Sequence, residues 1–301
     1  MQEYCIIIPV VFKDYFFLKR TMNYICKNLS PVAIFIITDL EMSRYLPKEV
    51  QSCDLCKIID ENHIVEEMTY TKVNSILKSH GRQHTKTGWY YQQFLKMAFA
   101  FSNFCCTDYY LSWDSDTIPL KNLCFFDKDN RPYFTMKSEY HKPYFNTMER
   151  LLSIGKTNPG SYIAEHMMFN KDIMKEMINR IEESGIEGEK WYEIILNSLE
   201  PEHISPFSFS EFETYGTYCS VFHPDLYVER YLNGFRKGGL IQGRFVSDNI
   251  LQKMAEDFDM ASFEIYERPP FPWGKICEWN EKWLNRKEWF LKKLVIHNGK
   301  R

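Results

Sequence analysis

The stretch Asp108-Tyr109-Tyr110-Leu111-Ser112-Trp113-Asp114-Ser115-Asp116 decides the fold class. An aromatic and apolar run of strand length ends in two acids that are separated by one residue. Because alternate side chains of an extended segment point the same way, the carboxylates of Asp114 and Asp116 can face one cavity. Ligands of open α/β sheets bind outside the carboxyl ends of the strands. The stretch therefore predicts a strand that ends in a ligand site.

The segments around this strand predict a mostly parallel sheet. Apolar runs at 4–12, 32–38 and 57–60 are typical of buried strands, and helical stretches separate them, with the clearest helix at 88–102. Further strands are predicted at 131–137 and 162–169, and a helix at 171–184. Without a linker or repeat, we expect one α/β domain over 1–301 that consists of two halves, 1–130 and 131–301.

The composition excludes several classes of protein. The 37 Lys and Arg are balanced by 40 Asp and Glu, unlike the basic excess of a nucleic-acid-binding protein. The apolar runs are far shorter than the roughly 20 residues of a membrane-spanning helix. No secretory signal precedes the first strand, so we expect a cytoplasmic protein, with the inner face of the membrane as an alternative location. Its nine cysteines are then free thiols, and Cys53-x-x-Cys56 is neither a zinc nor a redox motif.

The acidic pair predicts a metal site. Mg²⁺ and Mn²⁺ favour oxygen ligands and complete their shells with substrate phosphates, which makes a nucleotide diphosphate the natural partner. Asp-x-Asp alone is a weak pattern, and the second copy, Asp127-Lys128-Asp129, is interpreted as a solvated turn. Asp114 and Asp116 differ because they interrupt a buried segment, where unpaired carboxylates are costly. A Mn²⁺ or Mg²⁺ ion would compensate that cost.

The run Tyr110-Leu111-Ser112-Trp113-Asp114-Ser115-Asp116-Thr117-Ile118-Pro119-Leu120 resembles the DxD segment of GT-A glycosyltransferases. With the helix at 88–96, with Ile8-Pro9 and Asp14, and with the segments 59–61, 166–169 and 210–216, the chain resembles an uncharacterised bacterial family of glycosyltransferase-like proteins from surface-polysaccharide loci. The resemblance implies a Rossmann-like GT-A fold and a nucleotide-sugar donor, with a UDP-sugar expected, which the half at 1–130 would bind. It also implies a glycan or lipid-linked glycan acceptor, which the half at 131–301 would bind. It also implies donor contacts in three regions: Pro9, Asp60 and Glu61 near the nucleoside; Gln92, Gln93 and Lys96 on the helix; Asp114 and Ser115 at the acidic pair. An ordinary exposed helix face is the alternative for Gln93 and Lys96.

Two glutamates are candidates for the catalytic base. Inverting transfer needs a carboxylate that takes the proton of the acceptor hydroxyl. Glu211 and Glu213 follow Ser210, which can cap a helix and hold them at its N-terminus. Residues two positions apart do not share a helix face, so only one of them can point into a cleft, and Glu211 is preferred. The alternative is that both only complement the helix dipole.

Two further regions are candidates for ligand contacts. Glu165 and His166 end a predicted strand and are assigned to the donor sugar or the acceptor, although a histidine among apolar residues is more often structural. His297, near the C-terminus, is a candidate metal ligand because GT-A enzymes that this chain resembles place a late histidine on the metal and imidazole suits Mn²⁺. A fraying chain end is the alternative for His297.

The tail from Phe271 on holds four of the seven tryptophans among several Lys and Arg residues. We expect the tryptophans to pack this helix onto the domain, and peripheral membrane contact is the alternative. The sequence thus predicts a metal-dependent, inverting glycosyltransferase that acts on a bacterial surface glycan such as capsule, lipopolysaccharide or exopolysaccharide. The rivals are a metal-dependent nucleotidyltransferase or phosphohydrolase, and a non-catalytic glycan-binding protein.

Overall fold

The computed structural model describes residues 2–298, with side chains through residue 293. Its central sheet has the strand order β3-β2-β1-β4-β7. Every residue of β1 and β2 is buried, as in parallel strands that helices cover on both faces. β1 and β4 are parallel, and Tyr4 lies opposite Tyr109. The strands are β1 (Tyr4–Pro9), β2 (Ala33–Thr38), β3 (Cys56–Asp60), β4 (Tyr109–Trp113) and β7 (His166–Asn170). This sheet confirms the predicted α/β class.

The chain order reverses between β1 and β4, because β2 and β3 extend the sheet on one side and β4 and β7 on the other. In open α/β sheets, ligands bind at such a reversal, outside the carboxyl ends of the two strands. Pro9 ends β1, and Asp114 directly follows β4. The predicted position of the acidic pair at a strand's carboxyl end is therefore confirmed.

Two compact units interleave along the chain. Unit 1 comprises Met1–Ile7, Asp60–Ser112 and Phe125–Tyr231, and unit 2 comprises Ile8–Ile59, Trp113–Cys124 and Leu232–Arg301. The expected division into halves near residue 130 does not match these units, because the chain passes from one unit to the other within strands of the sheet. The roles assigned to the two halves stay predictions.

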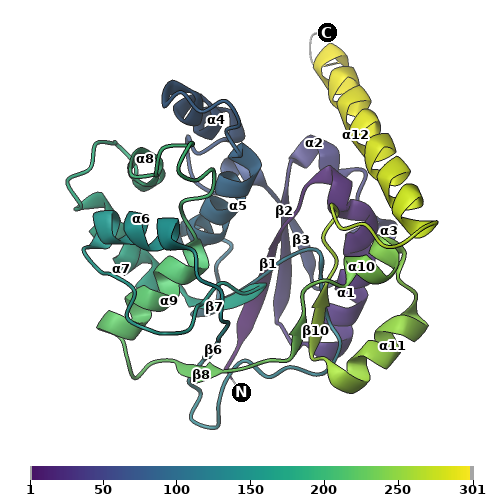
Figure 1. Ribbon diagram of the computed structural model, residues 1–301, viewed down its shortest axis with the longest axis horizontal. Coiled ribbons are helices and arrows are strands. Elements are labelled where there is room, and N and C mark those ends of the chain that lie inside the picture. The colour runs from purple at the N-terminus through teal and green to yellow at the C-terminus, as the bar shows by residue number, and fades with distance from the viewer. Residues whose placement is uncertain (1, 299–301) are drawn as a thin grey trace. The chain divides into compact units, whose positions relative to one another are not determined.

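Unit 1 is rich in helices (Figure 1), and the helix contacts include α4 with α5, α7 with α8, α6 with α9 and α5 with α9. A short parallel pair of strands, β6 and β8, completes it. Its further elements are η2 (Glu61–His63), α4 (Tyr70–Ser79), α5 (Thr87–Ala98), η3 (Phe99–Phe101), β6 (Tyr133–Thr135), α6 (Lys142–Leu152), α7 (Lys171–Glu182), α8 (Trp191–Asn197), α9 (Glu211–Phe222) and β8 (Val228–Arg230).

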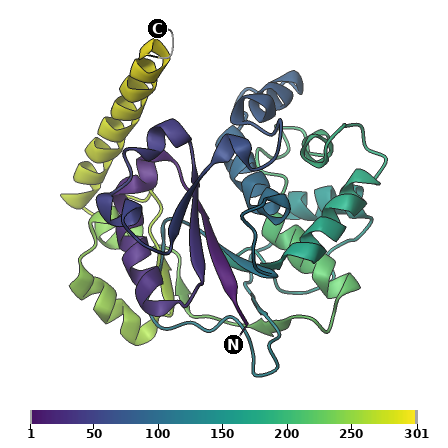
Figure 2. The same cartoon turned by 180° about the vertical axis from the view of Figure 1, so that it is seen from behind.

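Unit 2 is built on α1, which packs along β5 and lies beside the strands of this unit in the view from behind (Figure 2). α1 buries Leu18, Met22 and Ile25 at the spacing of one helix face. A second sheet has the order β5-β10-β9. The further elements are η1 (Phe12–Asp14), α1 (Tyr15–Asn28), α2 (Leu40–Ser43), α3 (Lys48–Gln51), β5 (Thr117–Pro119), β9 (Gly234–Phe235), α10 (Gly239–Gln242), η4 (Gly243–Phe245), α11 (Asp248–Asp257), β10 (Met260–Ser262) and α12 (Trp273–Asn298).

Several local predictions need correction. The helix predicted at 88–102 covers Thr87–Ala98 and continues as a 3₁₀ turn. Glu165 and His166 lie at the start of a strand, not at its end. The tryptophans of α12 are exposed rather than packed: Trp279 is 69% and Trp283 56% exposed. The nine cysteines are free thiols, as predicted. Within residues 2–298, no helix combines the length and apolar character needed to cross a bilayer.

Candidate functional site

The loop that carries the acidic pair is held from two sides in unit 2. The indole nitrogen of Trp113 donates to the carbonyl of Thr117 at 2.8 Å, across the loop. The hydroxyl of Thr21, on α1, donates to the carbonyl of Ser115 at 2.7 Å. Both bonds are buried, so water does not compete for them. The backbone that presents the two carboxylates is therefore fixed by the packing of α1 and by its own turn.

A third carboxylate, which no sequence motif predicts, joins the pair. β10 runs antiparallel to β5, so that Ser262 lies opposite Thr117. The next amide, that of Phe263, donates to the carbonyl of Asp116 at 2.9 Å. This register places Glu264 beside Asp116, and their carboxyl groups are hydrogen-bonded to each other. No motif surrounds Glu264, because strand pairing over about 150 positions of sequence brings it here.

The acids at this place oppose one another's ionisation. Burial, and then the negative charges of Glu264 and Asp114, raise the pKa of Asp116 well above its usual value. Burial likewise raises the pKa of Glu264, although its hydrogen bond to Asp116 works against this shift. Carboxylates that share a site resist holding full charge unless a cation joins them. The cluster of Asp114, Asp116 and Glu264, here called the acidic cluster, thus has the electrostatics of a cation site.

A buried arginine stands next to the acidic cluster. Arg244, on η4, pairs with Asp14 at 2.7 Å and donates through Nε to the carbonyl of Phe263 at 3.2 Å. Its positive charge acts to lower the pKa of Asp116, against the larger effect of burial. Planar guanidinium groups suit phosphate oxygens as well as carboxylates. Arg244 is the second residue of this region that sequence reasoning missed.

The residues fit a hard divalent cation in chemistry but do not enclose one. In residues 2–298, no three His, Cys, Asp or Glu side chains are arranged to hold a metal ion by themselves. Mg²⁺ is usually bound through one or two carboxylates plus substrate phosphates and water, without a cage made only of protein. The acidic cluster matches that partial donor set. By contrast, Asp127 accepts from the amides of Asp129 and Arg131, which confirms the second Asp-x-Asp as a turn.

In unit 1, two of the predicted donor contacts are buried in a different environment. Gln93 and Lys96, on α5, are each 4% exposed, so the alternative of an exposed helix face is wrong. The side-chain carbonyl of Gln93 accepts from the amide of Glu211 at 3.0 Å. The ammonium of Lys96 pairs with the Glu211 carboxylate at 2.9 Å and lies 4.3 Å from the centre of the Phe212 ring. These contacts join α5 to the N-terminus of α9.

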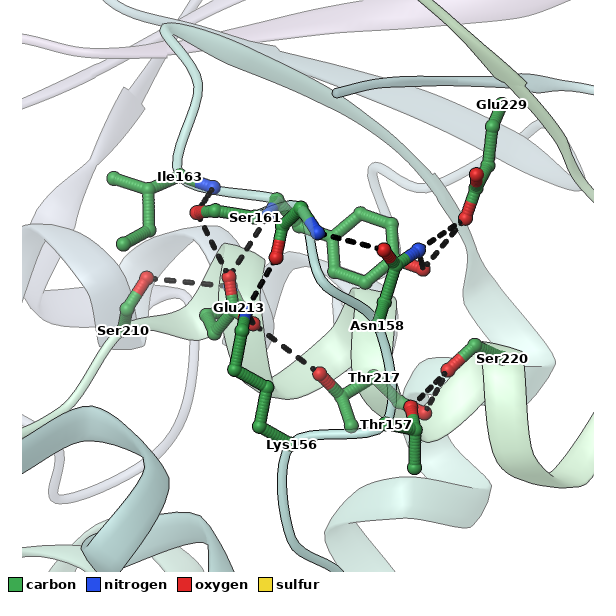
Figure 3. Close-up of polar contacts among 12 residues, drawn as sticks. Lys156, Thr157, Asn158, Ser161, Ile163, Ser210, Glu213, Thr217, Ser220 and Glu229 are labelled. Atoms are coloured by element: carbon green, nitrogen blue, oxygen red, sulfur yellow. Dashed lines mark hydrogen bonds and ion pairs between the residues drawn. The ribbon is translucent and has the colours of Figure 1, made fainter. Parts of the chain in front are cut away.

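Glu213 has a separate network, drawn in Figure 3. Its carboxylate accepts from the amide of Tyr162 at 2.8 Å, from the Ser161 hydroxyl at 3.1 Å and from the Thr217 hydroxyl at 3.4 Å. The ammonium of Lys156 lies at 3.6 Å. Ser210 caps α9 as predicted, by accepting from the amide of Glu213. With this many donors on a carboxylate 1% exposed, the geometry favours a role in fixing the segment 156–163.

The other predicted contacts of unit 1 also have protein partners. Asp60 accepts from the amide of Asn62 at 3.0 Å and lies 2.6 Å from the His63 ring nitrogen. The carbonyl of Glu61 accepts from the Tyr91 hydroxyl at 2.8 Å. Gln92 is half-buried. These interactions do not test a nucleoside contact, which stays a prediction for Asp60, Glu61 and Gln92.

Glu165 and His166 are buried beside cations. Glu165 pairs with Lys137 at 3.2 Å. Nε2 of His166 lies 3.0 Å from the Thr135 hydroxyl. Burial, followed by the nearby charges of Arg230 and Lys137, holds the pKa of His166 well below its usual value of 6.5. The ring is therefore neutral in the folded protein at neutral pH.

The chain can now be placed among known proteins. The model of a family described as of unknown function, DUF6492, matches residues 29–234, which is more than half of the chain. The chain belongs to this DUF6492 family. The matched range includes Asp114, Asp116, Lys96 and Glu211, but it ends before Glu264 and α12. No relative was found among the curated proteins.

The solved structures that match the chain include three glycosyltransferases. Mouse xyloside xylosyltransferase 1 has 10% identity and a TM-score of 0.42, over 89% of this chain and 100% of that chain. The galactosyltransferase LgtC, in complex with donor and acceptor sugar analogues, has 10% identity and a TM-score of 0.39, over 94% of this chain and 95% of that chain. The glycosyltransferase GlyE of Streptococcus pneumoniae has 12% identity and a TM-score of 0.40, over 97% of this chain and 64% of that chain. Values this low do not establish a shared activity.

His297 and Pro9 complete the predicted site of this DUF6492 member. The side chain of His297 lies outside the described residues. Pro9 is buried at the end of β1, in the same unit as the acidic cluster, where the next amide, that of Val10, donates to the carbonyl of Ile37. A nucleoside contact for Pro9 stays a prediction.

The neutral state of His166 predicts how stability depends on pH. Below pH 6.5 the unfolded chain binds a proton at this residue and the folded chain does not, so stability falls as the pH falls. The expected loss from this residue is about 1.4 kcal/mol for each pH unit while the folded ring stays neutral. Urea unfolding at pH 7 and pH 5 should show a smaller loss for His166→Gln than for the natural chain. Equal losses in both proteins would contradict this assignment.

Proposed function

We propose that this chain is a metal-dependent glycosyltransferase of the GT-A type that uses a nucleoside-diphosphate sugar as donor. One observation carries the proposal: Asp114 and Asp116 follow β4 at the point where the sheet order reverses, and Glu264 joins them. The resemblance of residues 110–120 to the DxD segment of GT-A enzymes supports the same conclusion. An incomplete set of hard oxygen ligands is what a cation shared with a diphosphate needs.

The residues of unit 2 have complementary roles in this proposal. Asp116 and Glu264 would hold Mn²⁺ or Mg²⁺, and Asp114 and the neighbouring Ser115 would contact the donor. A bound cation would neutralise negative charge on the diphosphate as it leaves. Arg244 holds η1 and the end of β10 in place through Asp14 and Phe263, which fixes the position of the acidic cluster. A UDP-sugar is the proposed donor.

Glu211 is the proposed base that takes the proton of the acceptor hydroxyl, with inversion at the anomeric carbon. Its ion pair with Lys96 and the bond from its amide to Gln93 fix its orientation. Glu213 is the weaker candidate, because four donor groups already surround its carboxylate. A product that retains the donor's anomeric configuration would remove the base role from both. The proposed acceptor is a bacterial surface glycan, free or lipid-linked, and the resemblance alone supports it.

A thermal-shift screen tests donor binding directly. The protein is heated with UDP-, GDP-, CMP- and TDP-sugars, each with and without Mn²⁺. We expect one nucleotide class to raise the unfolding temperature only when Mn²⁺ is present, because ligand binding to the folded state adds stability. At one hundred times the dissociation constant the gain is about 2.7 kcal/mol. A folded protein that responds to no donor, or responds equally without Mn²⁺, would contradict metal-dependent donor binding.

A further inference from the structure

An exposed apolar stripe runs along α12. Ile276, Trp279, Trp283 and Phe290 are spaced by three, four and seven residues, which places them within an arc of about 60° at 100° per residue. Trp279 is 69%, Trp283 56% and Phe290 54% exposed. These four residues are called the α12 stripe. Such large exposed side chains on one helix face normally mark an interaction site.

The stripe is distinct from the face that attaches α12 to unit 2. The buried residues of the described part of this helix are Cys277 and Leu284, and they lie about a third of a turn away from the stripe. α12 packs on η1 and η4, where Gly243 allows the close approach of Cys277. Beyond Leu284, no side chain up to residue 293 is buried. One face of the helix therefore packs on unit 2, and no described part of the chain covers the face that carries the stripe.

The charges of α12 are segregated around the stripe. Lys275, Lys282, Arg286 and Lys293 lie along one side of it and Lys287 along the other, all within about a quarter of a turn of its centre. Glu278, Glu281 and Glu288 lie on the opposite half of the helix, together with one lysine, Lys292, which pairs with Glu288 at 2.9 Å. The ion pairs of Glu278 with Lys275 and Lys282 are exposed, so they hold these lysines only weakly. The helix carries six basic and three acidic residues, although the chain as a whole has a net charge of -3.

We infer that α12 binds the surface of an anionic lipid bilayer, with the stripe among the acyl chains and the flanking cations at the headgroups. Tryptophan and phenylalanine on one face with lysine and arginine beside them are the features of helices that lie in a bilayer interface. Anionic lipids attract such basic residues over a Debye length. A second copy of the chain would bring like charges together, which disfavours that occupant. The inference does not depend on the proposed function.

Attachment through α12 has a consequence for unit 2. η1 and η4, on which α12 packs, also carry Asp14 and Arg244. Lys287 lies 5.7 Å from the centre of the Phe12 ring, so the contact reaches the same 3₁₀ turn as Asp14. A bilayer-bound helix would therefore hold these turns, and Arg244 with them, close to the membrane surface.

Vesicle flotation of the full chain tests the inference. We expect the protein to float with phosphatidylcholine vesicles that contain 30% phosphatidylglycerol and to stay unbound with pure phosphatidylcholine. The bound fraction should fall when the salt concentration is raised to 0.5 M, because salt screens the cations. Two variants separate the apolar and the electrostatic contributions to binding. The first removes the two tryptophans of the stripe, by Trp279→Ser and Trp283→Ser. The second removes three cations, by Arg286→Gln, Lys287→Gln and Lys293→Gln. Each should lower the vesicle partition coefficient at least tenfold.

Matched controls keep the test specific. Tyr231→Ser removes an aromatic side chain that is 78% exposed outside α12, and Lys128→Gln removes an exposed cation; both should float as the natural chain does. The α12 variants should unfold at the unchanged temperature, because the side chains removed are exposed. A natural chain that does not float, or α12 variants that float as well as it does, would overturn the inference. The inference would also be overturned if the natural chain did not bind vesicles but formed a dimer in solution that the stripe variant abolished.

Discussion

Replacing Asp116 with asparagine should lower kcat for sugar transfer at least about a thousandfold and, without a cation, should stabilise the fold. Activity falls because the proposed cation loses a ligand. Stability rises because the high pKa of Asp116 means that its charge opposes folding at neutral pH, where burial and Glu264 disfavour the ionised form. The two effects are measured by initial rates with Mn²⁺ and by thermal unfolding in a chelator.

The second Asp-x-Asp offers a matched control for this variant. Asp129→Asn changes the same residue type in an exposed turn, so it should leave both activity and stability unchanged. The opposite signs of the two Asp116 effects separate a cation ligand from a structural residue, whose loss would lower both. An Asp116→Asn protein that transfers sugar at the natural rate, or one that is less stable in chelator, would contradict the assignment.

Replacing Lys96 with methionine should destabilise the protein by about 3–5 kcal/mol, because Glu211 would be left as a buried charge without its ammonium partner. Replacing the partner instead, by Glu211→Leu, should lower stability by a similar amount, because Lys96 would then be the buried charge without its carboxylate partner. The double variant should recover most of the loss, because an apolar pair of similar volume often replaces a buried ion pair at little cost. Urea unfolding of the four proteins measures the coupling between the two residues.

An exposed ion pair serves as the control for the four Lys96 and Glu211 proteins. Lys19 and Glu49 lie 2.5 Å apart, yet their side chains are 48% and 53% exposed, so removing either should change stability little. The double variant of Lys96 and Glu211 also tests the base. A double variant that is stable and active would remove Glu211 from the role of base. Additive single changes would contradict the buried ion pair.

The strands and the acidic pair could be predicted because their signals are local. β1, β2 and β4 are continuous apolar runs, and Asp114 and Asp116 break one of them at its end. Ser210 as helix cap is also a local pattern, and the structure has that bond. A strand that is buried on both faces consists almost entirely of apolar residues, so it can be recognised without knowing which strands pair with it.

Glu264 and Arg244 could not be predicted because their positions depend on pairing between distant segments. β10 has three residues, and its antiparallel register with β5 is what brings Glu264 to Asp116. Arg244 reaches Asp14 from a short 3₁₀ turn 230 positions later in the chain. Neither residue has a neighbouring motif.

The environment of Lys96 could not be predicted, and that of the α12 tryptophans was predicted wrongly, for a related reason. A lysine at helical spacing suggests an exposed face, and only the packing of α5 on α9 shows that Glu211 meets it. Periodicity shows that α12 has apolar faces but not which of them the protein covers. Cys277 and Leu284 occupy the covered face, which left Trp279 and Trp283 exposed.

The nucleotide product of the reaction distinguishes sugar transfer from attack at phosphorus. The protein is incubated with Mn²⁺ and the donor selected by the thermal-shift screen, with and without a glycan acceptor, and the nucleotides are separated by chromatography. The account predicts release of the nucleoside diphosphate by the natural chain and by Asp129→Asn, and none by Asp116→Asn. Release of nucleoside monophosphate together with sugar 1-phosphate from a nucleoside-diphosphate sugar would identify attack at phosphorus and contradict the proposal, as would nucleoside diphosphate formed equally well without Asp116.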